Sequence, residues 1–100
     1  MIARVTRYQV AAGQVDETIE DFRNRRVPTA RPRRGYRRGY LLIDRKTGNC
    51  ITVAFWDAEK DAIADEDSGE YQRRIDFGKD LYTVLPVREL YEVIEEQTKA

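Results

Sequence analysis

The pattern of apolar and polar residues along this chain of 100 residues predicts four strands. The segment 2–10 is rich in residues that favour strands, and it ends shortly before a glycine. Segments 36–44 and 50–56 are strands joined by the loop RKTGN, in which Gly48 and Asn49 favour a tight hairpin. The segment 87–95 follows Pro86 and gives the fourth strand.

A helical period predicts a helix over 14–27, between the first two strands. Its apolar residues recur on one face, at Val15, Ile19 and Phe22. Acidic residues come early in this segment and arginines come late, an order that complements the helix dipole. Pro28 and Pro32 predict that the helix ends in a kink or a break.

Two shorter helices are expected over 58–66 and 69–81, with Asp57 and Ser68 as their candidate caps. The order of the elements is therefore β-α-β-β-α-β. This order is typical of the ferredoxin-like α+β fold, in which a four-stranded antiparallel sheet carries its helices on one face. The length favours a single domain over residues 1–100.

The third strand carries apolar residues on both of its faces. Ile51, Val53 and Phe55 alternate with Cys50, Ala54 and Trp56. A sheet with one face in water should instead alternate cleanly between apolar and polar residues. We therefore expect a homodimer in which a second subunit covers the face that the helices leave open. Two such sheets packed face to face would form a dimeric α+β barrel.

Charge is balanced over the whole chain but segregated along it. Lys and Arg number 18, as do Asp and Glu. Residues 22–43 contain eight arginines and no acid, whereas residues 57–70 contain seven acids and one lysine. Such segregation favours pairing between the two segments, within one subunit or between subunits. We expect the acids of 65–70 to lie in a solvated loop.

The arginine-rich stretch 31–38 raises the alternative of a nucleic-acid partner, because Tyr36 and Tyr40 could stack on bases. The two tyrosines are expected to share one face of their strand, while Arg37 and Arg38 point to opposite faces. A groove for single strands needs its basic and aromatic groups on one open surface. A basic pocket rim, or ion pairs with the acidic segment, is therefore favoured, and no nucleic-acid partner is expected.

Composition excludes several kinds of site. The chain has no histidine, which removes imidazole zinc ligands, a proximal histidine for haem, and any catalytic triad with an imidazole base. Its one cysteine, Cys50, cannot form an internal disulfide and is expected to be a buried, inert thiol. No apolar run is long enough to span a bilayer, and no signal segment opens the chain. We expect a cytoplasmic protein with no membrane partner, no metal and no cofactor.

Four stretches carry a resemblance to a known family: MIARVTRYQVAAGQVDE, VPTARPRRGYRRGYLLI, ITVAFWDAEKDA and SGEYQR. Their common pattern is the opening strand at 1–5, Pro28 followed by Gly35 and Tyr36, and the strand end at 55–58. Over about residues 2–94 the chain resembles the antibiotic biosynthesis monooxygenase domain of the dimeric α+β barrel superfamily. The resemblance implies the same fold and a homodimer formed through the sheets.

The resemblance also implies a range of activities. Some members of the family oxidise polycyclic aromatic polyketides with O₂ and no cofactor, some act on quinols or quinones, and some degrade haem. The haem-degrading members use a histidine ligand that this chain lacks. The expectation is therefore a cofactor-independent monooxygenase acting on a planar aromatic or quinone-like molecule. The alternative is a module of the same fold that binds a ligand or assembles without catalysis.

The polyketide oxygenases of this family resemble the chain at Trp56, at the end of the third strand. Their pocket asparagine four residues earlier corresponds to Thr52, their pocket tyrosine to Ala62, and their helical arginine to a position near Asp76. Candidates close to the last two positions are Tyr71, Arg73 and Arg74. Of these, Thr52, Trp56, Tyr71 and Arg74 are taken as ligand-binding candidates.

The strands themselves add three more ligand-binding candidates. Thr6 and Tyr8 lie on one face of the first strand together with Arg4, whose burial there would require an acidic partner. Tyr40 lies on the second strand, and tyrosine hydroxyls at the rim of an apolar pocket can orient a phenol or polarise a carbonyl. Trp56 has two interpretations that the sequence leaves open. It either stacks on a planar ligand or packs in the core beneath a crossing helix.

Overall fold

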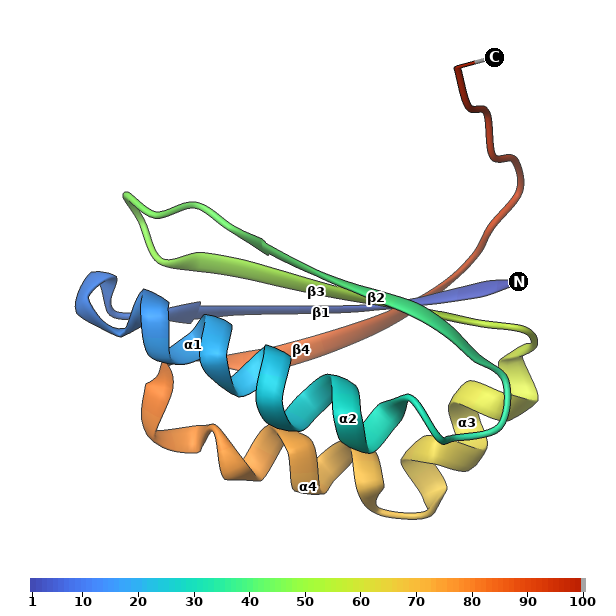
Figure 1. Cartoon of the computed structure of the whole chain (residues 1–100), viewed down its shortest axis with the longest axis horizontal. Coiled ribbons are helices and arrows are strands. Elements are labelled where there is room, and N and C mark those ends of the chain that lie inside the picture. Colours follow the sequence, from blue (N-terminus) through green and yellow to red (C-terminus); the bar gives the residue numbers. More distant parts are fainter. Residues whose placement is uncertain (100) are drawn as a thin grey trace.

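The computed structural model describes residues 1–99 and confirms the α+β class (Figure 1). Four strands form one sheet in the order β2-β3-β1-β4, and every neighbouring pair is antiparallel. Their bounds are β1 Ile2–Val10, β2 Tyr36–Ile43, β3 Asn49–Trp56 and β4 Tyr82–Glu92. The helices cover one face of the sheet and leave the other face open (Figure 1). No helix among residues 1–99 is long and apolar enough to cross a membrane.

The first helical segment is longer than the sequence predicted. It runs through α1 (Val15–Asp21), a π-helical turn (Phe22–Arg26) and α2 (Val27–Ala30). The prolines were expected to mark a kinked or broken end of the helix, and the helix does end at Ala30, between Pro28 and Pro32. It continues past Pro28 because of the wide turn before it. The Val27 N–H donates to the carbonyl of Phe22, five residues back. The helix is therefore wider just before Pro28, and this leaves room for the proline ring, which has no N–H to donate.

The other helices are α3 (Glu59–Asp67) and α4 (Glu70–Phe77), with short 3-10 turns at Ala12–Gln14 and Lys79–Leu81. Asp57 does not cap α3, since its carboxylate accepts a hydrogen bond from Arg37 instead. Ser68 does accept a hydrogen bond from the Glu70 N–H, at 3.2 Å, although Gly69 is the capping residue of α4.

Two irregularities in the edge strands were not predicted. In β2, Tyr36 lies opposite Trp56 while Arg38 lies opposite Phe55, so Arg37 is an extra residue in a β-bulge. In β4, which begins at Tyr82 rather than at residue 87, the pairing with β1 shifts in the stretch that contains Pro86. An edge strand tolerates a proline there because the missing N–H would face away from the sheet.

The β-bulge places Tyr36 and Tyr40 on opposite faces of the sheet. Because one residue is inserted between them, Tyr36 lies on the helix-covered face with Trp56, and Tyr40 lies opposite Val53 on the open face. The expectation that the two tyrosines share a face is therefore wrong. Tyr40 instead packs edge-on against Phe55, with ring centroids 6.1 Å apart.

The side chains that β1 points toward the helices change character along the strand. Tyr8 and Val10 form a core cluster with Val15 and Cys50 at one end of the sheet. Ile19, Ile43, Leu81 and Tyr82 pack against this cluster. Thr6 follows in the middle of the strand, and Arg4 lies toward the other end. The hydrophobic core thus occupies one half of the covered face, and polar residues occupy the other half.

Candidate functional site

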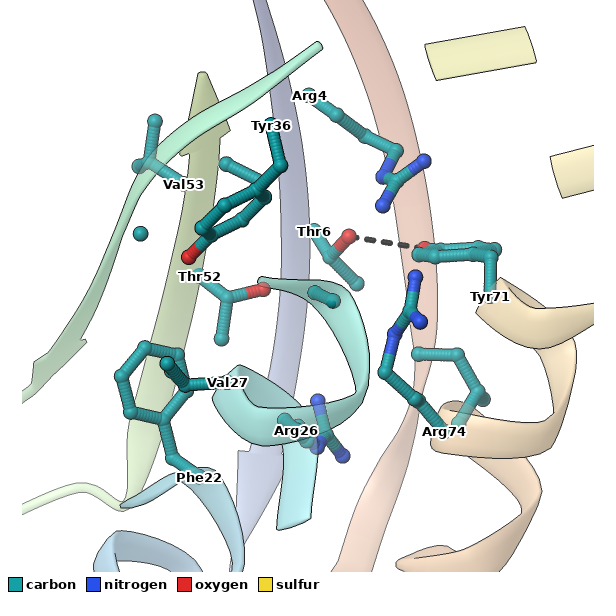
Figure 2. A pocket seen from close by; sticks show the side chains of 14 residues that line it. Arg4, Thr6, Phe22, Arg26, Val27, Tyr36, Thr52, Val53, Tyr71 and Arg74 are labelled. Atoms are coloured by element: carbon teal, nitrogen blue, oxygen red, sulfur yellow. Dashed lines mark hydrogen bonds between the residues drawn. The ribbon is translucent and has the colours of Figure 1, made fainter. Parts of the chain in front are cut away.

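A cavity of about 50 Å³ lies between the covered face of the sheet and the helices above it (Figure 2). Strands β1, β2 and β3 form its floor, and the π-helical turn, α2 and α4 form its roof. Its polar lining consists of Arg4, Thr6, Arg26, Tyr36, Thr52, Tyr71 and Arg74. Its apolar lining includes Phe22, Val27, Ala30, Ala54 and Ile75. No carboxylate is among the described residues that line it.

One buried carboxylate holds the arginines at the inner end of this cavity. Asp65 in α3 is 0% exposed, and Arg4 donates to its Oδ2 at 2.9 Å. Arg74 donates to the same oxygen, and the Nε of Arg33 lies 3.3 Å from Oδ1. A charge buried to this degree is stable only when it is paired, so Asp65 and the guanidinium groups around it depend on one another.

Arg4 is held by aromatic rings as well as by acids. Its guanidinium carbon lies 4.2 Å from the ring centroid of Tyr71 and 5.1 Å from that of Trp56. A desolvated guanidinium gains energy over the face of an aromatic ring. Glu66 lies 3.5 Å from Arg4, and Arg88 reaches the other oxygen of Glu66 at 2.8 Å. Arg4 is therefore fixed in place from several sides.

Arg26 brings a third buried guanidinium to the cavity from the helical side. Its Nε lies 2.9 Å from an oxygen of Asp21, and one of its terminal nitrogens donates to the hydroxyl of Tyr82. Arg26 is 8% exposed. The acids that pair with these arginines, Asp21 and Asp65, are not among the described residues that line the cavity. The charged groups in the lining are therefore all positive.

Tyrosine hydroxyls complete the polar lining. The hydroxyls of Tyr71 and Thr6 are hydrogen-bonded at 2.8 Å (Figure 2). Burial raises the pKa of Tyr71, although this hydrogen bond and the charge of Arg4 oppose the shift. Burial also raises the pKa of Tyr36, against the opposing charges of Arg31 and Arg74. Both phenols are therefore protonated at neutral pH and can act as hydrogen-bond donors.

Arg74 has one nitrogen that the protein leaves without a partner. The side chain reaches up from α4 into the cavity (Figure 2), and the residue is 5% exposed. One terminal nitrogen donates to Asp65, but no described residue accepts a hydrogen bond from the other, Nη1. Burial lowers the pKa of Arg74, and the neighbouring Asp65 offsets part of this shift. A buried donor without an acceptor is rare in folded proteins.

The structure brings four of the seven candidate residues together. Thr6, Thr52, Tyr71 and Arg74 all line the cavity. Tyr8 is 4% exposed and belongs to the core cluster at the far end of the sheet. Tyr40 points from the open face and lies outside this cavity.

Trp56 is 0% exposed and is not among the residues that line the cavity. It lies behind the lining, where Tyr36 meets it edge-on with ring centroids 5.5 Å apart. The residues near the two remaining positions of the family pattern also differ in whether they reach the cavity. Ala62 is fully buried, and Arg73 and Asp76 are exposed. Tyr71 and Arg74 are therefore the polar residues of this region that reach the cavity.

Arg4, Arg26 and Tyr36 line the cavity and Asp65 supports it, but none of the four was among the seven ligand-binding candidates. The expectation that the acids of 65–70 form a solvated loop is wrong, because Asp65, Glu66 and Asp67 lie in α3 and Glu70 begins α4. Asp65 is also fully buried. The signal was present, because Asp61, Ala62 and Asp65 recur at helical spacing on one face. An arginine at a buried strand position also requires an acid nearby. Arg26 was assigned only to the helix dipole.

Two arginines of the basic stretch pair with the acidic segment of the same chain. Arg33 contacts Asp65, as described above, and Arg37 donates to Asp57 at 2.8 Å. A further basic residue, Arg45, lies 3.6 Å from Asp16. No cluster of three or more potential acidic or cysteine metal ligands occurs within residues 1–99.

The sheet order β2-β3-β1-β4 and the helices on one face of the sheet define a ferredoxin-like α+β fold (Figure 1). Solved structures support this at the level of the fold. A protein from Deinococcus radiodurans assigned as an antibiotic biosynthesis monooxygenase matches with a TM-score of 0.79 and 16% identity, over 100% of this chain and 99% of that one. No protein-family model and no curated protein sequence matches the chain.

Two neighbours have more specific descriptions. A mutant of SnoaB, a cofactor-independent oxygenase from Streptomyces nogalater, matches with a TM-score of 0.75 and 15% identity, over 98% of this chain and 97% of that one. The haem-degrader MhuD from Mycobacterium tuberculosis, with two haems in its active site, matches with a TM-score of 0.79 and 15% identity, over 98% of this chain and 100% of that one. Proteins with this fold thus have different activities, so a proposal about activity must come from the residues of the site rather than from the fold.

Proposed function

We propose that this protein is a cofactor-independent monooxygenase that acts on a planar aromatic or quinone-like molecule bound between the sheet and its helices. The observation that carries the proposal is the cavity with Arg4, Arg26 and Arg74 in its lining and no carboxylate facing it. Positive groups held in a site that excludes water stabilise negative charge as it develops. The absence of histidine from the chain disfavours haem ligation through an imidazole.

The chemistry needs only the substrate and O₂. An aromatic molecule with an activated CH₂ or hydroxyl group loses a proton to solvent, and the arginines lower the free energy of the anion. The electron-rich anion then reduces O₂. For a CH₂ group, both C–H bonds break, one oxygen atom becomes the new carbonyl, and the other leaves as water. All four electrons come from that carbon, so no external reductant is required.

Oxygen consumption by the purified protein tests this proposal. We expect anthrones to be oxidised to anthraquinones at a rate that depends on protein concentration, without added flavin, haem or metal. Arg74→Gln should lower kcat/KM at least tenfold, because it removes a cavity-lining charge. Arg73→Gln changes the neighbouring, exposed arginine by the same chemistry and should leave the rate unchanged. Equal rates with and without protein across these substrates would refute catalysis.

A non-catalytic module of the same fold is the second candidate, and the size of the cavity favours the form that serves assembly rather than binding. Pockets for drug-sized ligands usually measure about 300–1,000 Å³, whereas this cavity measures about 50 Å³. Such a module would consume no oxygen, so the same assay separates the two candidates.

We further propose that the protein is a homodimer formed through the open face of the sheet. Ile51, Val53 and Phe55 alternate along β3 with Thr52, Ala54 and Trp56 of the covered face, and all three are partly exposed. Around them Leu42 is 52% exposed and Val87 is 62% exposed. An apolar surface of this extent is typical of an interface between subunits.

A further inference from the structure

The open face of the sheet carries a pair of charged residues within a mostly apolar surface. The register of the strands arranges the side chains of this face in rows that run across the sheet. One row consists of Leu42, Ile51, Arg7 and Val87, and the next of Tyr40, Val53, Val5 and Glu89. Arg7 therefore stands on a central strand and Glu89 on the neighbouring edge strand, and the other six positions of the two rows are uncharged.

Within one subunit these two residues form an ion pair. The Nε of Arg7 donates to Oε1 of Glu89 at 3.2 Å, and the hydroxyl of Tyr91 donates to Oε2 at 2.5 Å. The hydrogen bonds from Tyr91 and Arg7 hold the pKa of the Glu89 carboxyl below its ordinary value. Glu89 is therefore ionised at neutral pH. Both side chains of the pair are about half exposed, so water reaches them in a single subunit.

Arg7 has donors that its own subunit does not use. A guanidinium group carries N–H donors on its terminal nitrogens as well as on Nε. Only the Nε of Arg7 donates to a described residue, and its terminal nitrogens form no hydrogen bond within residues 1–99. A second sheet packed on this face would remove water from these donors. A charge buried in this way requires a new acceptor, and a carboxylate is the strongest one.

The same face of a second copy offers that acceptor. Among the described residues, the strand positions of this face hold one acid, Glu89. Its carboxylate can accept further hydrogen bonds, since two oxygens offer about four lone-pair sites. Packed sheets lie about 10 Å apart, a gap that two long facing side chains can bridge.

Two-fold symmetry makes such a contact reciprocal. When residue i of one subunit contacts residue j of its partner, residue j of the first contacts residue i of the second. A pair between Arg7 and the partner's Glu89 is therefore formed twice in one dimer. Two copies of this chain satisfy each other's donors, whereas a purely apolar partner surface would leave the terminal nitrogens of both arginines without acceptors.

We propose that Arg7 of each subunit pairs with the partner's Glu89 across the interface, and that these reciprocal pairs make the open face selective for a second copy of this chain. The inference rests on the proposed homodimer and adds to it the residues that choose the partner. Apolar side chains alone would tolerate other apolar surfaces or a shifted arrangement of the two sheets. Charged pairs do not, because a wrong arrangement brings like charges together.

Two charge reversals test the inference, because they complement each other. Arg7→Glu leaves only acids at the pair, and Glu89→Arg leaves only bases. Each variant alone should dimerise roughly a hundredfold or more weakly than the wild type, since like charges then meet across the interface. An equimolar mixture of the two variants should form heterodimers, because an acidic face then meets a basic one. Sedimentation equilibrium measures the affinities, and native mass spectrometry distinguishes heterodimers by mass.

The mixture also separates lost pairing from misfolding, because two misfolded variants would not restore each other. Arg73→Glu is the matched control, since it reverses an exposed arginine that pairs with Glu70 on α4, and it should dimerise like the wild type. Single reversals that dimerise as tightly as the wild type, or a mixture that stays monomeric, would overturn the inference and leave the homodimer standing. A monomeric wild type would refute the homodimer and the inference together.

Discussion

At the scale of single residues, Asp65 is the side chain on which most other parts of the site depend. It is fully buried and contacts Arg4, Arg33 and Arg74. Removing its charge would leave buried guanidinium groups without a counter-ion. We expect Asp65→Asn to lower the free energy of unfolding by about 3–5 kcal/mol, as is typical when one partner of a buried pair is removed. Urea denaturation measures this change.

Asp57→Asn is the matched control for Asp65→Asn. Asp57 pairs with Arg37 on the surface, where both side chains are more than half exposed. Exposed pairs contribute about 0–1 kcal/mol, so this variant should unfold almost like the wild type. Equal effects of the two substitutions would contradict the role assigned to Asp65.

We propose a packing role for Trp56, because it is fully buried and is not among the residues that line the cavity. Trp56→Ala should lower the free energy of unfolding by about 3–5 kcal/mol through the hole it leaves. Trp56→Phe should have a much smaller effect. As Trp56 is the only tryptophan, the wild-type emission should be blue-shifted and resistant to acrylamide. Strong quenching by acrylamide would show that the ring meets solvent.

Tyr8 makes the free energy of unfolding fall as the pH rises in the alkaline range. Burial raises its pKa above the ordinary value, and the charge of Arg26 opposes only part of the shift. Below about pH 10 Tyr8 is protonated in both the folded and the unfolded state, so its full contribution is present. Above that pH the unfolded state loses the proton first, and stability falls by up to about 1.4 kcal/mol per pH unit. Tyr8→Phe should make denaturation midpoints less sensitive to pH above 10; an unchanged slope would contradict this.

Part of the site could be predicted from residue types alone. Thr6, Thr52, Tyr71 and Arg74 were found because strand parity and the family pattern both depend on local spacing. The role of Asp65 depends on its contact with Arg4, and the two residues belong to segments about sixty residues apart. Local spacing can place Asp65 on one face of its helix, but it does not identify Arg4 as the partner.

At the scale of elements, the strands and the class of fold followed from periodicity, but irregular backbone did not. The π-helical turn at Phe22–Arg26 and the bulge at Arg37 each displace the chain by one residue. Such displacements arise where tertiary packing overrides local preference, and they decide which side chains face the cavity. Tyr36 reaches the lining for this reason, and Tyr40 does not.

The hairpin between β2 and β3 offers a test at this scale. Gly48 has a φ of +76°, and a Cβ there would lie 1.9 Å from the carbonyl oxygen of Val10. Gly48→Ala should therefore lower the free energy of unfolding by roughly 1–3 kcal/mol, the range expected for a strained backbone conformation. Thermal and urea denaturation would detect the loss.

Gly13→Ala is the control for that substitution. No atom lies within 4 Å of a Cβ built at Gly13, and its φ is not positive. The variant should be neutral or slightly more stable, since alanine restricts the unfolded chain. A loss of stability equal to that of Gly48→Ala would show that the turn conformation is not the cause.

At the scale of the whole molecule, the proposed dimer is tested by placing a charge on the open face. Ile51→Glu should produce monomers at micromolar concentration, because a carboxylate would be buried between two apolar sheets. Phe77→Glu is the matched control, since Phe77 is 76% exposed on α4, away from the sheet. We expect it to remain dimeric in analytical ultracentrifugation. A wild-type protein that sediments as a monomer would refute the dimer, whose interface should exceed about 1,200 Å².

The interrupted edge strands also limit how copies of this protein can aggregate. A continuous edge would let one sheet add to another without end and so build fibres. Here β2 is broken by the bulge at Arg37, and the pairing of β4 is broken near Pro86, which has no N–H to offer. These irregularities shorten the regular stretch that each edge of the sheet offers to another strand. Association through the open face remains, and such a contact closes on itself after two subunits.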